Sequence, residues 1–280
     1  MFPSLRARRD TSRPAAGGFP ADNARSHTYT MATAAQNTRM ARHASGPSTF
    51  ARIVILISGR GSNMMALVEA IERQGLPVEV AGVVSNRPDA PGLAWAHDKG
   101  IPCRMVDHHR FADRAAFDVA LGDAIDELAP PSGRPWVVLA GFMRVLTEGF
   151  IARYPDRIVN IHPALLPAHP GLHTHRQALR DGALLHGATV HFVTPEVDVG
   201  PIIAQAVVPV LTGDTEEKLA ARVLEMEHRL FPMVLDWLTA DRVTVSAEGR
   251  ALLDGSDHPS SRTLIHPLLA GLSSTGGSGF

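Results

Sequence analysis

The chain has 280 residues with 27 basic and 28 acidic side chains, which leaves a formal net charge of -1. This length can bury the core of one large or two modest domains, whereas the near-neutral charge lacks the basic field that attracts nucleic-acid backbones. The single cysteine, Cys103, excludes an intrachain disulfide and a cysteine-clustered zinc site. Because no apolar run is long enough for a membrane span, we expect a soluble, cytoplasmic protein.

The two ends of the chain differ in composition from the middle. Residues 1–50 mix Arg, Ser, Thr, Ala, Gly and Pro without apolar periodicity, which is typical of disorder. An Arg-rich start also fits a transit peptide, but Met31 and Met40 offer later start points, and a disordered tail or an over-extended start is the favoured interpretation. We predict a disordered extension over 1–50, one domain over 51–246 and a loosely ordered tail over 247–280.

The domain opens with a buried strand and a glycine-rich turn. Residues 52–58 are a continuous β-branched run, Gly59-Arg-Gly-Ser-Asn63 follows, and a helix is predicted over 64–73. Strand, glycine turn and helix together present free N–H groups and a helix dipole to an anion. Met64 replaces the third glycine of a dinucleotide fingerprint and no Walker lysine follows, so the turn favours a monophosphate. The alternative is an ordinary tight turn.

Strands and helices then alternate. Strands are predicted over 78–86, 101–106 and 136–140, and helices over 90–99 and 108–128. This alternation predicts an α/β fold, doubly wound around a mostly parallel sheet, with a Rossmann-like N-terminal half. In such sheets ligands bind beyond the carboxyl ends of the strands. The turns that begin at Gly59, Gly141 and Asn160 each follow a strand and should therefore converge on one rim.

The C-terminal part of the domain has a different pattern. A helix is predicted over 173–181, and strands over 187–193 and 202–210 form a hairpin. Asp214 is predicted to cap a long helix whose apolar stripe runs at helical spacing. The stripe consists of Leu219, Val223, Met226, Leu230 and Val234.

A polar pair ends the strand near residue 160. Asn160 and His162 are two residues apart, so an extended backbone presents both on one face, and Pro163 ends the ladder. An amide donor beside an imidazole suits chemistry in which a carbonyl oxygen gains negative charge and a proton moves. The alternative is a turn-capping Asn with a hydrogen-bonded structural His, and this stretch alone leaves both interpretations open.

Several histidines invite a metal interpretation. They are His169, His173, His175, His186 and His191. His173 and His175 flank one Thr, but no third ligand follows at a known metal-site spacing. We therefore predict no metal site.

Five motifs occur in order between about residues 52 and 245, and together they resemble the folate-dependent phosphoribosylglycinamide formyltransferases. They are Ile-Ser-Gly-Arg-Gly-Ser-Asn, Val-Leu-Ala-Gly-Phe-Met-Arg, Asn-Ile-His-Pro-Ala-Leu-Leu-Pro with Pro-Gly-Leu-His-Thr-His, Gly-Ala-Thr-Val-His-Phe-Val-Thr, and Val-Asp-Val-Gly-Pro-Ile-Ile. The family often carries Ser at the position of Ala164. Because alanine has no hydroxyl, the corresponding loop hydrogen bond is not expected in this chain.

The resemblance implies a purine-biosynthesis enzyme. A formyl group would pass from 10-formyltetrahydrofolate, a co-substrate, to the primary amine of glycinamide ribonucleotide, with no metal, nucleic acid or membrane as partner and a monomer or homodimer as the assembly. Asn160, His162 and Asp198 match the catalytic trio. Asn160 and a protonated His162 would stabilise the tetrahedral oxyanion, and Asp198 would assist proton transfer. Taken alone, Asp198 reads as a turn-forming residue before Gly200.

The resemblance also assigns both binding sites. The ribonucleotide site would contain Gly61, Ser62 and Asn63, with Arg114 at the phosphate and Glu227 at the glycinamide end. The folate cleft would contain Phe142, Met143, Arg144, Val145 and Leu146. Without the resemblance, Arg114 and Glu227 read as solvated helix residues, and Phe142 and Met143 as core.

Three alternatives share parts of this pattern. Formyltetrahydrofolate deformylases use the same trio with water as acceptor, but they lack the Gly-Arg-Gly-Ser-Asn loop and usually add an N-terminal regulatory domain. Methionyl-tRNA formyltransferases add a C-terminal RNA-binding domain, for which the segment after residue 246 is too short. A non-catalytic nucleotide-binding protein on the same fold would have no use for Asn160, His162 and Asp198.

Overall fold

A computed structural model describes residues 50–130, 133 and 135–270. The extension predicted over 1–50 therefore lies, apart from Phe50, outside the described residues. Among the described helices, none combines the length and the apolar content that a membrane crossing requires.

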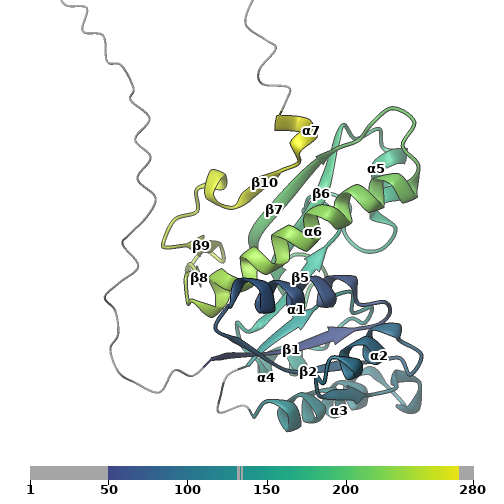
Figure 1. The fold of residues 1–280 in the computed structure, drawn as a ribbon, viewed down its shortest axis with the longest axis vertical. Helices are drawn as coiled ribbons and strands as arrows, with labels where there is room; N and C mark the ends of the chain where they lie inside the picture. Colours follow the sequence, from purple (N-terminus) through teal and green to yellow (C-terminus); the bar gives the residue numbers. More distant parts are fainter. Residues whose placement is uncertain (1–49, 131–132, 134, 271–280) are drawn as a thin grey trace, which may run out of the picture. The chain divides into compact units, whose positions relative to one another are not determined.

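One eight-stranded sheet organises the domain, with strand order β10-β7-β6-β5-β4-β1-β2-β3 (Figure 1). Strand β6 pairs antiparallel with both β5 and β7, while the remaining pairs of this sheet are parallel. The predicted doubly wound, mostly parallel α/β fold and the β6–β7 hairpin are thus confirmed. The strands are β1 Ala51–Ile57, β2 Val78–Ser85, β3 Cys103–Met105, β4 Trp136–Leu139, β5 Ile158–His162, β6 Leu185–Phe192, β7 Ile202–Pro209 and β10 Thr263–Ile265.

Helices cover both faces of the sheet. A small separate hairpin, β8 Val243–Val245 with β9 Ala251–Leu253, follows the longest helix. The α-helices are α1 Ser62–Gln74, α2 Pro91–Asp98, α3 Arg114–Leu128, α4 Glu148–Arg153, α5 Thr174–Arg180, α6 Glu216–Thr239 and α7 Pro267–Ala270, and two 3-10 turns are η1 His108–Arg110 and η3 Pro259–Ser261.

Alternation along β1 divides the core into two layers. Ile53, Ile55 and Ile57 belong to the cluster that packs under α1, α2 and α6. Val54 and Leu56 face the opposite side and pack with residues of α3 and α4. Because both faces of β1 are covered, its sequence is apolar throughout, as expected for a central parallel strand.

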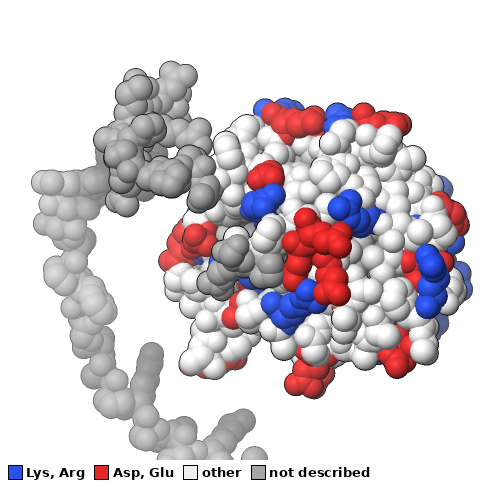
Figure 2. Space-filling model, turned by 90° about the horizontal axis from the view of Figure 1, so that it is seen from below, with Lys and Arg blue, Asp and Glu red and all other residues white. Residues whose placement is uncertain are grey.

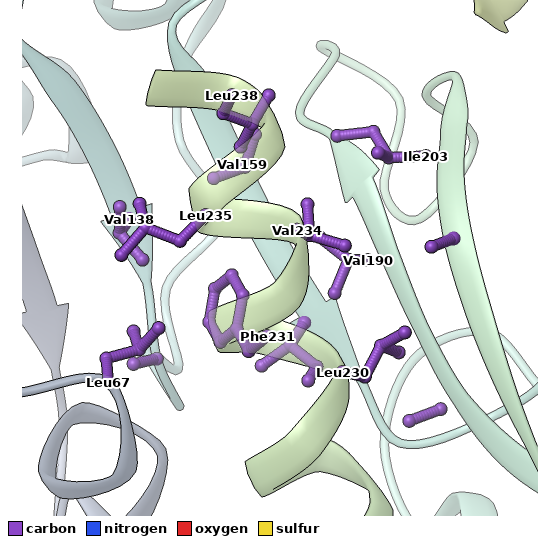
Figure 3. Packing of buried hydrophobic residues seen from close by; sticks show 14 of the residues in the cluster. Leu67, Val138, Val159, Val190, Ile203, Leu230, Phe231, Val234, Leu235 and Leu238 are labelled. Carbon is purple, nitrogen blue, oxygen red and sulfur yellow. The ribbon is translucent and has the colours of Figure 1, made fainter. Parts of the chain in front are cut away.

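Helix α6 packs across the middle of the sheet and joins its parallel and antiparallel parts. The predicted apolar stripe from Leu219 to Val234 is buried, which confirms it. Figure 3 shows Phe231 and Leu235 of this helix beside Val138 and neighbouring side chains of the sheet. Helix α6 also lies against α1.

Two helix starts differ from the prediction. The helix predicted over 108–128 is interrupted, because Asp113 in an extended conformation accepts from the N–H of Ala116 at 2.8 Å and starts α3 at Arg114. Helix α6 is capped by Thr215, not by Asp214. The carboxylate of Asp214 instead pairs with Arg222 at 2.7 Å, which satisfies it away from the helix end.

We predicted a loosely ordered tail over 247–280. The structure differs from this prediction over residues 247–270, which contain two paired strands. Strand β10 extends the sheet beside β7, and the guanidinium of Arg262 donates to the carbonyl of Ala251 at 2.8 Å. Ala251 and Leu253 belong to the core cluster. Backbone pairing at a sheet edge needs little apolar sequence, which is why composition did not reveal it. Residues 271–280 lie outside the described residues.

The described surface carries charges of both signs. Figure 2 shows acidic side chains grouped near the centre of one face with basic ones beside them. The ion pairs Arg104–Glu127 and Arg153–Asp123 have solvent-exposed side chains. Exposed pairs contribute little to stability. No wide field of one sign is visible on that face.

Because the side chain of Leu253 is buried and that of Leu252 is only half-buried, we expect Leu253→Ala to lower the free energy of unfolding by about 2–5 kcal/mol. Leu252→Ala is the matched control and should cost clearly less. Urea titration monitored by circular dichroism measures both. Equal, small losses would mean that β9 does not pack on the domain.

Candidate active site

The carboxyl ends of β1, β2 and β4 are fastened together around Ser58. Its N–H donates to the carbonyl of Gly141 at 3.0 Å. Its hydroxyl donates to Oδ1 of Asn86 at 2.5 Å and accepts from the N–H of Met143 at 2.7 Å. Since β5 pairs directly with β4, the turns after β1, β4 and β5 share one rim, as the sequence predicted.

A cavity of about 390 Å³ opens at this rim. The predicted phosphate turn, residues 59–63, lines it, together with Met143 and Arg144 of the predicted folate segment. Arg87 and His108 also line it, and neither was predicted as a site residue. With Arg60, three arginines line the cavity, which suits an anionic ligand, although the guanidinium of Arg87 already pairs with Asp89 at 3.0 Å.

The start of α1 has no side-chain cap, and Gly61 before it has φ 73°. The first N–H groups of the helix are therefore available to a ligand. A Cβ at Gly61 would lie 3.0 Å from Cε of Met64 and 3.4 Å from Cα of Gly92, so both backbone conformation and space require glycine. The N–H of Gly92 donates to the carbonyl of Gly59 at 3.1 Å and supports the turn from α2.

Asn63 and Glu227 form a buried pair behind this turn. Nδ2 of Asn63 donates to Oε2 of Glu227 at 2.7 Å, which ties α1 to α6. Burial raises the pKa of Glu227, and the hydrogen bond from Asn63 partly opposes this. Glu227 is not among the residues that line the cavity. In the structure it contacts the predicted phosphate turn from behind, through Asn63.

Asn160, His162 and Asp198 come together at the end of β5. Oδ2 of Asp198 lies 3.4 Å from Nδ1 of His162, and the side chains of these two residues are only 10% and 6% exposed. Oδ1 of Asp198 lies 3.8 Å from Nε2 of His191, and Nδ2 of Asn160 lies 3.2 Å from the same nitrogen. His191 therefore lies beside both groups and is within hydrogen-bond distance of the amide only.

The hydrogen bonds of His191 determine how Asn160 is oriented. Nδ1 of His191 lies 2.9 Å from the carbonyl of Phe192, which can only accept, so this nitrogen carries the proton. Burial lowers the pKa of His191, which favours a neutral ring whose Nε2 accepts from Asn160. Sequence reasoning missed His191 in this role, because the β5–β6 register that pairs it with Asn160 is not visible in the chain.

Asp198 is held in a strained turn. It has φ 59°, a conformation that short polar residues tolerate best, and its Oδ2 accepts from the N–H of Gly171 at 2.8 Å. A Cβ at Gly200 would overlap the carbonyl oxygen of Phe192. Asp198 therefore both shapes the turn and contacts His162.

The second nitrogen of His162 also meets an acceptor. Its Nε2 lies 3.0 Å from the carbonyl of His169, so a protonated ring can donate on both sides. Nearby, Nδ1 of His175 lies 3.1 Å from Nε2 of His186. Burial is the main cause that lowers the pKa of His186 to about 4 and also lowers that of His175.

Some of the predicted site residues are not among those that line the cavity. Arg114 is exposed at the start of α3 and is not among the residues that line the cavity. Phe142 and Leu146 are buried in the core cluster under α3, whereas Val145 is exposed. Arg87 and His108 could have been suspected, because they follow the ends of β2 and β3, where a parallel sheet binds ligands.

One group in the described part of the chain has the ligand spacing of a metal site. Ligand atoms of Asp107, His108 and His109 lie within 4.8 Å of one another. Asp107 accepts from the N–H of His109 at 3.0 Å, and Nδ1 of His108 lies 2.9 Å from the carbonyl of Asn86. These polar atoms already have protein partners, and the group takes no part in the His162 cluster.

Comparison with known proteins gives consistent results. The formyl transferase family model matches residues 51–235. Phosphoribosylglycinamide formyltransferase of Escherichia coli K12 is 46% identical over 207 residues, which is 74% of this chain and 95% of the relative. The corresponding protein of Haemophilus influenzae is 39% identical over 210 residues, 75% of this chain and 97% of the relative.

Solved structures agree with these sequence relatives. Phosphoribosylglycinamide formyltransferase from Coxiella burnetii, in complex with CHES, has a TM-score of 0.70 and 41% identity over 78% of this chain and 99% of that one. A formyltetrahydrofolate deformylase from Pseudomonas syringae has a TM-score of 0.65 and 27% identity over 72% of this chain and 65% of that one. Both named activities therefore occur on this fold, and the fold by itself does not distinguish them.

Because the folded-state pKa of His186 is about 4, against 6.5 for an ordinary histidine, the unfolded chain binds this proton first as pH falls. The stabilisation from the neutral ring is complete above about pH 6.5 and is lost between there and pH 4. We expect His186→Asn to weaken the pH dependence of the unfolding free energy in that window. Exposed His97→Asn is the control. Urea titrations at pH 7.5, 6 and 5 measure the free energy of unfolding. If it changed with pH by the same amount in both variants, the prediction would be contradicted.

Proposed function

This chain belongs to the phosphoribosylglycinamide formyltransferase family of purine biosynthesis, and from that premise we propose a specific reaction. The formyl group of 10-formyltetrahydrofolate passes to the primary amine of glycinamide ribonucleotide. The observation that carries the proposal is the meeting of Asn160, His162 and Asp198 on the rim that also holds the phosphate turn. It supports acyl transfer beside an anchored, phosphorylated acceptor.

The cavity supports a monophosphate as the anchor of the acceptor. The uncapped start of α1 and the N–H groups after Gly61 would bind the phosphate oxygens, with Ser62 adding a hydroxyl. Arg87 lines the same cavity and would bring a cation near the phosphate, although it also pairs with Asp89, and His108 would add a hydrogen-bonding ring. Arg114 is exposed and is not a lining residue. The buried Asn63–Glu227 pair would hold the turn in place and brings a carboxyl near the acceptor.

Exposed apolar side chains support a folate site on the neighbouring surface. Met143 and Val145 are exposed on the loop after β4. Leu172 and Val199 are also exposed, on the two loops that the Gly171–Asp198 hydrogen bond joins. Such side chains suit a flat heteroaromatic ring, while Arg144 and backbone groups would orient it. Phe142 and Leu146 would shape this cleft from the core side.

The mechanism uses these residues in order. The acceptor amine attacks the formyl carbon, a C–N bond forms, and the carbonyl electrons move onto oxygen. An N–H of Asn160 donates to the oxyanion, and the positive charge of protonated His162, whose two ring N–H groups face Asp198 and the carbonyl of His169, stabilises it electrostatically. Asp198 takes a proton from the new ammonium, directly or through water, and passes it to the folate nitrogen as the oxyanion re-forms the carbonyl and the bond between the formyl carbon and that nitrogen breaks. No step requires a metal, because the formyl carbon is already electrophilic.

The decisive assay measures loss of 10-formyltetrahydrofolate with and without glycinamide ribonucleotide. We expect turnover only with the acceptor present and a formylated amine as product. Rapid turnover without acceptor would instead establish the deformylase reaction, whose fold this chain shares.

The phosphate turn can be tested with two glycine variants of α1. Gly61 and Gly75 both have positive φ and lie at opposite ends of this helix. We expect Gly61→Ala to raise the KM for the ribonucleotide, because the turn must shift, with little change in the KM for the folate. Gly75→Ala carries similar backbone strain away from the cavity and should leave both KM values unchanged. A similar KM rise in both variants would point to a general loss of structure.

The division of labour at the site can be tested by a double-mutant cycle on kcat. Loss of the charged contact in His162→Ala should cost about 2.7–4 kcal/mol, or roughly a hundred- to a thousand-fold in kcat. Asp198→Asn removes the charge but keeps the size. Because both residues act as a unit, the double variant should be little worse than the more damaging single one. Independent, multiplying losses at saturating folate would argue against the coupled mechanism.

A further inference from the structure

His169 combines two unfavourable features at one position. Its backbone has φ 53°, which a non-glycine residue adopts at a cost. Its Nδ1 is buried and has no hydrogen-bond partner among the described residues. Such features persist where the surroundings hold a residue firmly, and they concentrate at functional positions.

The side chain of His169 is fastened from two directions. Its Nε2 lies 3.3 Å from Oδ2 of Asp181, and only 14% of the side chain is exposed. Its ring packs edge-on against His186, with ring centroids 5.7 Å apart. Asp181 follows the last residue of α5. A tautomer with the proton on Nε2 donates to Asp181 and leaves Nδ1 as a bare acceptor.

The carbonyl of the same residue contacts His162. The two atoms, Nε2 of His162 and the oxygen of His169, are 3.0 Å apart, while the other ring nitrogen of His162 faces Asp198. The imidazole is thus held at both edges, by a carboxylate and by a backbone carbonyl. Terminal torsions of histidine have broad minima, so removal of one edge would let the ring turn.

We propose that His169 is a positioning residue for His162. The contacts of its imidazole with Asp181 and His186 hold the backbone in the left-handed conformation that aims its carbonyl at the catalytic ring. This inference rests on the catalytic role of His162 in the proposed function. It assigns a task to a loop residue that is not among the residues lining the cavity.

The test compares kcat and KM in variants of this clamp. His169→Ala and Asp181→Ala should each lower kcat by roughly ten- to a hundred-fold, as expected for a misplaced catalytic group, with less than about a twofold change in either KM. The double variant should be no worse than the more damaging single one, because both break one contact. His169→Gln should recover part of kcat, since its amide nitrogen can reach Asp181.

Arg180→Ala is the matched control. Nε of Arg180 lies 2.8 Å from the other carboxylate oxygen of Asp181, and its removal should leave kcat unchanged. A loss equal to that of Asp181→Ala would overturn the proposal, because the effect would then belong to the end of α5 as a whole.

His162→Ala, measured in parallel, separates the two levels of inference. If its kcat stays near the parental value, the proposed catalytic role of His162 fails. If His162→Ala is inactive while folded His169→Ala and Asp181→Ala keep parental kcat, only the positioning role is overturned. Thermal midpoints and circular dichroism establish that each variant is folded.

Discussion

The antiparallel pairing of β6 with β5 is the constraint on which the site depends. It places His191 opposite Asn160 and Thr189 opposite His162. Thr189 then accepts from the N–H of Leu166 at 3.1 Å and donates to the carbonyl of Ala164 at 2.6 Å, which anchors the loop after β5. A slip of one residue would turn every side chain of β6 to the other face. The reversal of one strand in a parallel sheet thus completes the polar cluster.

The rim combines two electrostatic environments, both of which the proposed reaction would use. The cavity around the α1 start has cationic walls and free N–H groups, whereas the cluster at β5 has a buried carboxylate between two imidazoles. Buried charges of this kind act strongly on one another because little water screens them. Ser58 holds the cavity side of this rim together, since its one hydroxyl bonds the turns after β2 and β4.

Much of this arrangement could be predicted from local patterns in the chain. The apolar run of β1, the glycine turn and the alternation of strands and helices determine the sheet class and the rim where ligands bind. Asn160 and His162 could be recognised together because a strand has a two-residue period. Motifs in a fixed order added Asp198, which by itself looks like an ordinary turn residue.

The sequence by itself therefore determined the fold class, the phosphate turn and the catalytic candidates, because these depend on local period and turn chemistry. Only the tertiary structure decided the contacts of His191 and His169 with the predicted catalytic residues, the place of Arg87 in the cavity lining, the contact of Glu227 with Asn63 behind the turn, and the inclusion of β10 in the sheet. These depend on strand register, on helix packing between α1 and α6, and on backbone pairing at a sheet edge. Such contacts join residues far apart in the chain, and no local pattern encodes their partners.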